Sequence, residues 1–206
     1  MLLFHGTTLN RLFEIMKDGF LGTEKTVWNC SEENTTYFYS EDFIKEEHDI
    51  TSEDREQIKT LGIQQALGNA DITLALETKN LKRVVLVFDS EDLEKFGKLE
   101  KDNSCGQNME YCLKFSGKIP LDLAKELWID KTDLDLLALY FKGFAYSRNE
   151  QQTEYQLNLD DSLDSEIIEC AKIAYEKLSE YFYDNLESVD CLEETSIEKL
   201  KEGLKA

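Results

Sequence analysis

The chain has 206 residues, of which 41% are hydrophobic, and this share excludes a wholly disordered protein even though 32% of the residues are charged. The formal net charge is −20, which disfavours a broad surface for bare DNA or RNA because the phosphates would be repelled. A protein target or a basic partner fits this charge better.

The first twenty residues predict a strand, a tight turn and a helix. Leu2–His5 has strand composition, Gly6 permits the turn, and a following threonine can cap a helix that ends at Gly19. The expected helix has apolar residues at helical spacing: Leu9, Leu12, Phe13 and Met16.

Further strands are expected along the next hundred residues. Thr26–Cys30 has strand composition, Thr35–Tyr39 reads as a strand or the start of a helix, and Val84–Phe88 is the clearest strand. Asn108–Phe115 predicts another strand, with Glu110 near its start.

Helical composition extends from Thr51 to Glu77, but Gly62 and Gly68 lie within it. Glycine destabilises a helix interior, so we expect one broken helix or two short ones. A short helix is also expected over Leu121–Trp128, after the only proline of the chain.

The sequence changes character near residue 130. We expect a domain over residues 1–130 and a mostly helical, acidic C-terminal extension over residues 131–206, in which the stretch from Glu150 holds sixteen acidic and five basic residues. Leu134–Phe144 is apolar and helical in composition, and Ile197–Leu204 could form a last short helix. One face of a long amphipathic helix is marked by Ile168, Ala171, Tyr175, Leu178, Phe182 and Leu186.

The five cysteines are irregularly spaced, with no Cys-x-x-Cys pair and only two histidines in the chain. This pattern predicts reduced thiols and no metal site. The N-terminus lacks the features of a signal peptide, and no run of about 18 apolar residues occurs. We expect a cytoplasmic protein without membrane association.

The order of these motifs resembles the ADP-ribosyltransferase superfamily, in its toxin-like and PARP-like branches, over roughly Leu2–Ile129. The His5-Gly6-Thr7 triplet looks like the family's first-strand motif, and the Asn108-Met109-Glu110-Tyr111 segment is similar to its late strand with a glutamate. The resemblance implies an α+β fold, with a split, mostly antiparallel sheet flanked by helices and a cleft for NAD⁺ as the substrate. The helical acidic C-terminal region would follow this domain.

The resemblance also implies roles for particular residues. Catalysis would fall to His5, Glu110 and Tyr39: the carboxylate of Glu110 would stabilise positive charge on the ribose, and His5 would donate a hydrogen bond to a ribose hydroxyl. Gly6 would let backbone groups approach the nicotinamide carboxamide without a side chain in the way. The NAD⁺ pocket would comprise His5, Gly6, Thr7, Trp28, Ser31, Tyr37 and Tyr39, in which one of the two tyrosines stacks on nicotinamide.

Each of these residues also has a structural interpretation. His5 could be a satisfied polar residue at a strand end, Glu110 a solvated carboxylate, and Trp28 a core residue. Tyr37 and Tyr39 are two apart and would share one face of a strand, so core packing explains at least one of them. His48 is expected to be exposed and without a functional role.

The sequence differs from the arginine-modifying branch of the family, because Asn108 stands two residues before Glu110 where that branch has Glu or Gln. The resemblance thus implies a mono-ADP-ribosyltransferase that acts on a protein as a bacterial or phage effector, and the acidic charge of the chain suits a basic, nucleic-acid-binding target. One alternative is a non-catalytic acidic mimic of nucleic acid that blocks a DNA- or RNA-binding protein. Another is NAD⁺-dependent RNA 2′-phosphotransfer, which the low arginine content disfavours.

Overall fold

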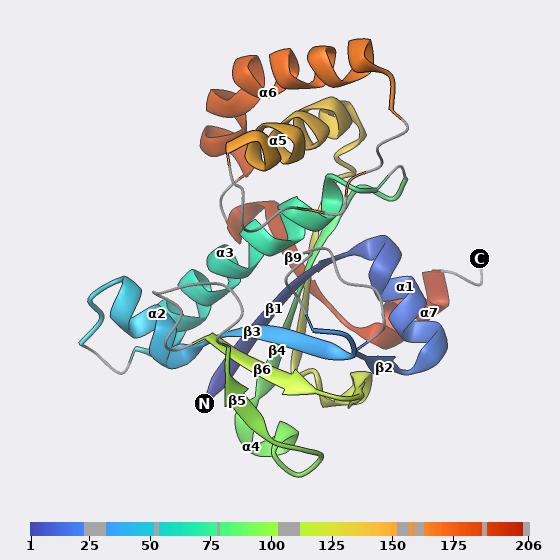
Figure 1. Cartoon of the computed structure of the whole chain (residues 1–206). Helices are drawn as coiled ribbons and strands as arrows, with labels where there is room; N and C mark the ends of the chain where they lie inside the picture. Colours follow the sequence, from blue (N-terminus) through green and yellow to red (C-terminus); the bar gives the residue numbers. More distant parts are fainter. Residues whose placement is uncertain are drawn as a thin grey trace.

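The structure is a computed structural model that describes residues 1–22, 32–51, 54–77, 79–102, 112–151, 157, 159, 163–186 and 189–203. It is an α+β fold in which helices flank a seven-stranded antiparallel sheet (Figure 1). No helix in these ranges is long and apolar enough to cross a membrane.

The main sheet has the strand order β5-β6-β3-β1-β4-β8-β9. Its strands are β1 (Leu2–Thr8), β3 (Thr35–Ser40), β4 (Arg83–Asp89), β5 (Leu99–Lys101), β6 (Cys112–Ser116), β8 (Glu126–Asp130) and β9 (Leu192–Thr195). β2 (Phe20–Leu21) and β7 (Ile119–Pro120) form a separate two-stranded sheet. The segment Thr35–Tyr39, which the sequence left open between strand and helix, is a strand.

Helices cover both faces of the main sheet (Figure 1). α1 (Leu9–Asp18) and α7 (Ile197–Gly203) pack on one face, which we call the α1 face, and α3 (Arg55–Leu74) packs on the other, the α3 face. α5 (Ala138–Gln151) and α6 (Ser165–Leu186) pack against each other beyond the end of α3. The remaining helical segments are α2 (Glu41–Glu47), α4 (Ser90–Leu93) and the 3₁₀ turns η1 (Leu121–Leu123), η2 (Asp135–Leu137) and η3 (Val189–Cys191).

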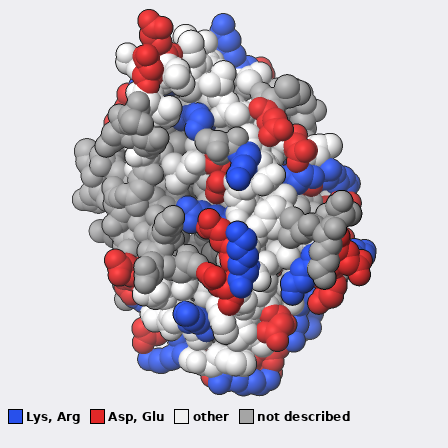
Figure 2. Space-filling model, turned by 90° about the vertical axis from the view of Figure 1, so that its right-hand side faces the viewer, with Lys and Arg blue, Asp and Glu red and all other residues white. Residues whose placement is uncertain are grey.

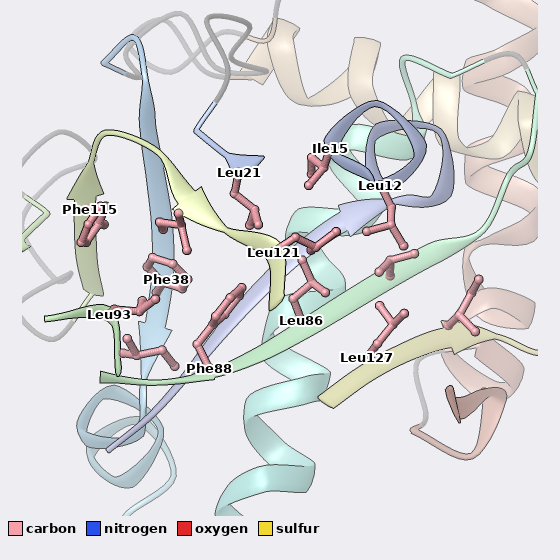
Figure 3. Close-up of a cluster of buried hydrophobic side chains, with 14 of the residues drawn as sticks. Leu12, Ile15, Leu21, Phe38, Leu86, Phe88, Leu93, Phe115, Leu121 and Leu127 are labelled. Atoms are coloured by element: carbon pink, nitrogen blue, oxygen red, sulfur yellow. The ribbon is translucent and has the colours of Figure 1, made fainter. Parts of the chain in front are cut away.

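β4 is the central strand that the continuous apolar run of the sequence predicts, and it is buried on both faces. Leu86 and Phe88 point into the cluster beneath α1, where they meet residues of α1, β3 and β8 (Figure 3). Val85 and Val87 point into the second cluster, beneath α3. The alternation follows from the two-residue period of a strand.

α1 has the boundaries that its sequence predicts. The side chain of Thr8 accepts a hydrogen bond from the backbone N–H of Arg11 at the start, and Gly19, with φ at 78°, ends the helix in the left-handed conformation. The expected turn at Gly6 is wrong, because β1 continues through Gly6 to Thr8. A Cβ on Gly6 would lie 1.9 Å from the carbonyl oxygen of Ala66, so glycine is needed there for the close approach of α3.

α3 is one continuous helix, so the expectation of a break at Gly62 or Gly68 is also wrong. Gly62 faces the sheet, where a Cβ would lie 2.3 Å from the ring of Phe4. Burial of that aromatic ring offsets the low helix propensity of glycine. Asp54 caps the helix by accepting hydrogen bonds from two backbone N–H groups.

The short helix expected over Leu121–Trp128 is wrong as well. Only one 3₁₀ turn forms, at η1, and the chain then enters β8. Leu127 and Ile129 are buried on the α1 face, whereas Trp128 packs on the α3 face. The side chains therefore alternate between the two faces with the two-residue period of a strand. Pairing of β8 with β4 satisfies its backbone.

The C-terminal region is helical as expected, but it also supplies β9 to the edge of the sheet. α6 is the long amphipathic helix, with Ala171 buried against α5. A Cβ on Gly143 of α5 would lie 1.9 Å from the carbonyl oxygen of Ala171, so the two helices are in backbone contact there. α7 forms at Ile197–Gly203, where a last short helix is expected.

Candidate functional site

The sheet opens between β1 and β3 at His5. β1 pairs with β4 along its whole length, from Leu2 to Thr8, but it pairs with β3 only at Leu3 and Phe4. Backbone pairing between the two strands therefore ends just before His5, the first residue of the candidate site along the chain.

Beyond the last backbone pair, the side chain of His5 connects β1 to β3. In the register that pairs Phe4 with Tyr39, Gly6 would face Tyr37, but the Nδ1 atom of His5 lies 3.0 Å from the carbonyl oxygen of Tyr37. A carbonyl can only accept a hydrogen bond, so Nδ1 carries the proton and donates it. In neutral His5 the other ring nitrogen, Nε2, is then a hydrogen-bond acceptor.

Burial keeps His5 in this neutral form. Its ring lies near that of Phe38, with centroids 5.9 Å apart, and desolvation lowers the pKa of His5 although the hydrogen bond to the Tyr37 carbonyl acts in the opposite direction. His5 therefore offers an acceptor at neutral pH, where the sequence suggests a donor. A ribose hydroxyl can bind to an acceptor as readily as to a donor, because it both donates and accepts hydrogen bonds.

Gly6 and Thr7 continue β1 beyond the opening and are both buried. The close approach of α3 explains why residue 6 is glycine, which gives this position a structural role whatever else it does. At the end of β1, the hydroxyl of Thr8 donates a hydrogen bond to the carboxylate of Glu77 at 3.1 Å.

Tyr37 and Tyr39 share one face of β3, as the two-residue spacing predicts. Tyr39 packs on the α3 face, with its ring centroid 5.1 Å from that of Phe43. His5 packs against Phe38, which belongs to the cluster beneath α1, so the structure does not bring the rings of Tyr39 and His5 together. Tyr37 adjoins His5 through its backbone carbonyl.

The hydroxyls of both tyrosines are engaged. Burial is the chief cause that raises the pKa of the Tyr39 hydroxyl, and the side chains of Gln65 and Asn69 on α3 act on this hydroxyl in the opposite direction. The hydroxyl of Tyr37 accepts a hydrogen bond from the backbone N–H of Glu32 at 2.8 Å. The ring of Tyr37 is thereby held beside the chain that leads into β3.

Three of the expected site residues, Trp28, Ser31 and Glu110, lie outside the described residues. The expected strand Thr26–Cys30 does so too. Glu110 precedes the first residue of β6, Cys112, by two positions, and Cys112 pairs with Tyr39 of β3. β3 alone separates β6 from β1 in the sheet, which is about 10 Å at the usual strand spacing.

Two polar residues near these tyrosines, Lys114 and Arg148, are not among the residues that the sequence predicts for the site. Lys114 pairs with Tyr37 across β3 and β6 and forms an ion pair with Glu32, which raises the pKa of its amine. Arg148 of α5 is near enough to Tyr39 for an electrostatic interaction, and burial lowers the pKa of its guanidinium. The alternation of β6 could have indicated Lys114, but no local signal links Arg148 to residue 39.

Comparisons with protein-family models, with curated proteins and with solved structures found no match. What the chain does is therefore inferred from its residues and their geometry.

Proposed function

We propose that this chain is an NAD⁺-dependent mono-ADP-ribosyltransferase that acts on a protein, with His5 and Glu110 as its principal residues. The observation that carries the proposal is the opening between β1 and β3 at His5. A neutral histidine with a fixed tautomer lies where β1 and β3 cease to pair, and β3 alone separates β1 from β6, the strand that follows Glu110.

The reaction would break the bond between C1′ of the ribose and the ring nitrogen of nicotinamide. Nicotinamide leaves with the bonding electrons, positive charge develops on the ribose, and the carboxylate of Glu110 stabilises that charge. The acceptor atom of the target protein then bonds to C1′ and releases its proton. The charge of the carboxylate is therefore what the step requires of Glu110.

His5 would hold the ribose rather than exchange protons. Its Nε2 accepts a hydrogen bond from a ribose hydroxyl, while Nδ1 stays on the Tyr37 carbonyl and fixes the ring. A stacked aromatic ring, from one of Tyr37 and Tyr39, would keep the nicotinamide in place.

Incubation of the purified chain with labelled NAD⁺ and bacterial lysates tests this function. Wild type would transfer label to a protein, and His5→Ala and Glu110→Ala would each lose the transfer. His48→Ala is the matched control, because His48 is the other histidine of the chain and is exposed. No transfer and no nicotinamide release by the wild type would overturn the proposal.

The net charge of −20 favours one second candidate, the acidic mimic of nucleic acid. A mimic would inhibit its target by charge alone, so His5→Ala and Glu110→Ala would inhibit as the wild type does. The face shown in Figure 2 carries acidic and basic side chains side by side, which is not the continuous acidic surface that a mimic needs.

A further inference from the structure

A cavity of about 530 Å³ lies on the α1 face, at the edge of the sheet formed by β8 and β9. It lies between the end of α1, β2, the turn after β7, and the start of α7. Its size is in the range of ligand-binding pockets. His5 does not line it, and the cavity is therefore distinct from the candidate site.

Apolar side chains form much of its wall: Met16, Phe20, Leu121, Leu127 and Ile197. Phe20 is 39% exposed, and the amine of Lys118 lies 5.7 Å from the centre of its ring. An exposed aromatic ring at the mouth of a cavity is a surface that an apolar group of a partner can cover.

The edge strand β9 runs beside this cavity. β9 is the last strand of the main sheet and pairs with β8, so in the described part of the chain its outer backbone groups have no strand beside them. Thr195, at the end of β9, lines the cavity, and Glu193 lies on the same face of the strand. An extended peptide could therefore pair with β9 and place a side chain in the cavity.

The charges around the edge favour a basic partner. Lys125 and Glu126 line the cavity but form ion pairs with other residues, Lys125 with Asp92 at 2.5 Å and Glu126 with Lys59 at 3.5 Å. The other charged residues of the cavity and of β9 are the exposed acids Asp122, Glu193, Glu194 and Glu198 and the base Lys201.

We propose that β9 and this cavity bind an extended, basic segment of a protein partner. The segment adds a strand to the sheet at β9. Basic side chains on the two faces of this strand meet Glu193 and Glu194, which lie on opposite faces of β9, and one apolar side chain enters the cavity beside Phe20. A second copy of β9 would bring like charges together at the same edge, which disfavours self-association there. The surface would serve in this way whether or not the chain uses NAD⁺.

Nuclear magnetic resonance on the ¹⁵N-labelled full chain tests the proposal, with an acetylated and amidated Lys-Lys-Val-Leu-Lys-Lys peptide, which has lysines on both faces of an extended strand, as the probe. We expect peptide-induced shifts at the amides of Leu192–Thr195 and Phe20. Combined Glu193→Lys and Glu194→Lys substitutions, and separately Phe20→Ser, would each weaken binding by about tenfold or more. A peptide with glutamate in place of each lysine would not bind.

Matched controls lie at the opposite edge of the sheet. Glu100→Lys reverses an exposed charge on the other edge strand, β5, and Phe96→Ser removes another exposed aromatic side chain; both would leave binding within about twofold of the wild type. Circular dichroism confirms that each variant is folded. The proposal is overturned if shifts map elsewhere, if the two peptides bind alike, if no shift occurs up to about 1 mM peptide, or if sedimentation shows a dimer that Glu193→Lys disrupts.

Discussion

The Nδ1 atom of His5 lies 3.0 Å from the carbonyl oxygen of Tyr37, at the point where β1 and β3 separate. One contact thus joins two strands that no longer pair and fixes which ring nitrogen carries the proton. The structural and the proposed chemical roles of His5 reside on different nitrogens, and they can be separated by mutation.

His5→Asn is expected to preserve the fold and remove the chemistry. The asparagine amide can donate to the Tyr37 carbonyl as Nδ1 does, but it places no acceptor at the position of Nε2. We expect NAD⁺ turnover to fall about 10- to 100-fold, which is about 1.4–2.7 kcal/mol in the barrier, with little change in the unfolding midpoint. Nicotinamide release measures the first and urea unfolding the second. Full turnover in His5→Asn would contradict the role given to Nε2.

The stability of the protein should depend on pH through His5. Burial lowers its pKa in the folded state, whereas the unfolded chain titrates near the ordinary value of about 6.5. Below that value the unfolded state binds more protons, so the free energy of unfolding falls as the pH drops from about 6.5 towards the folded-state pKa. Urea unfolding between pH 5 and 8 should show this loss in the wild type and a smaller loss in His5→Asn. Equal slopes for the two proteins would argue against a lowered pKa of His5 in the folded state.

Gly6→Ala should be strongly destabilising, because its Cβ would lie 1.9 Å from the carbonyl oxygen of Ala66 in α3. Overpacking of this kind costs about 1–3 kcal/mol, and more where backbone must move. Gly68→Ala is the matched control, because nothing lies within 4 Å of its Cβ and alanine favours the helix by about 0.5–1 kcal/mol. Thermal unfolding compares the two. A neutral Gly6→Ala would mean that α3 does not approach β1 this closely.

The fully buried Arg83 should be essential to the fold. Its guanidinium contacts Asp130 at 2.8 Å and Asp71 at 3.3 Å, and these carboxylates raise its pKa despite burial. Arg83→Met would leave two buried or partly buried carboxylates without their cation, at a cost of about 3–5 kcal/mol. Lys95→Met, at an exposed ion pair with Asp92, is the control and should change urea unfolding little. Similar midpoints for the two variants would contradict this account.

Local sequence signals predicted the elements whose causes are local. The Thr8 cap and the Gly19 stop of α1, the apolar run of β4 and the amphipathic α6 follow from neighbouring residues and form where expected. The turn expected at Gly6 does not form, and the reason for a glycine there is Ala66 of α3, 60 residues away. The helix expected over Leu121–Trp128 does not form either, because pairing with β4 decides the conformation of that segment. Long-range contacts of this kind leave no periodic signal in either segment.

Only the part of the candidate site that depends on neighbouring residues was predictable from the sequence. His5 stands out because a glycine and a threonine follow it on a first strand, and the structure adds its tautomer and its place at the opening of the sheet. The faces of Tyr37 and Tyr39 follow from strand alternation, but the effect of Gln65 and Asn69 of α3 on the pKa of Tyr39 depends on how the helix packs. The roles of Glu110, Trp28 and Ser31 stay predictions.

Nicotinamide release from NAD⁺ by the full chain, measured for wild type, Glu110→Gln and the control Glu100→Gln, tests the central claim most directly. Glutamine keeps the shape of the side chain and removes the charge that would stabilise the ribose in the transition state. The account predicts release by the wild type and by Glu100→Gln and a loss of about 100-fold or more in Glu110→Gln. Equal release by all three proteins, or none by the wild type, would contradict it.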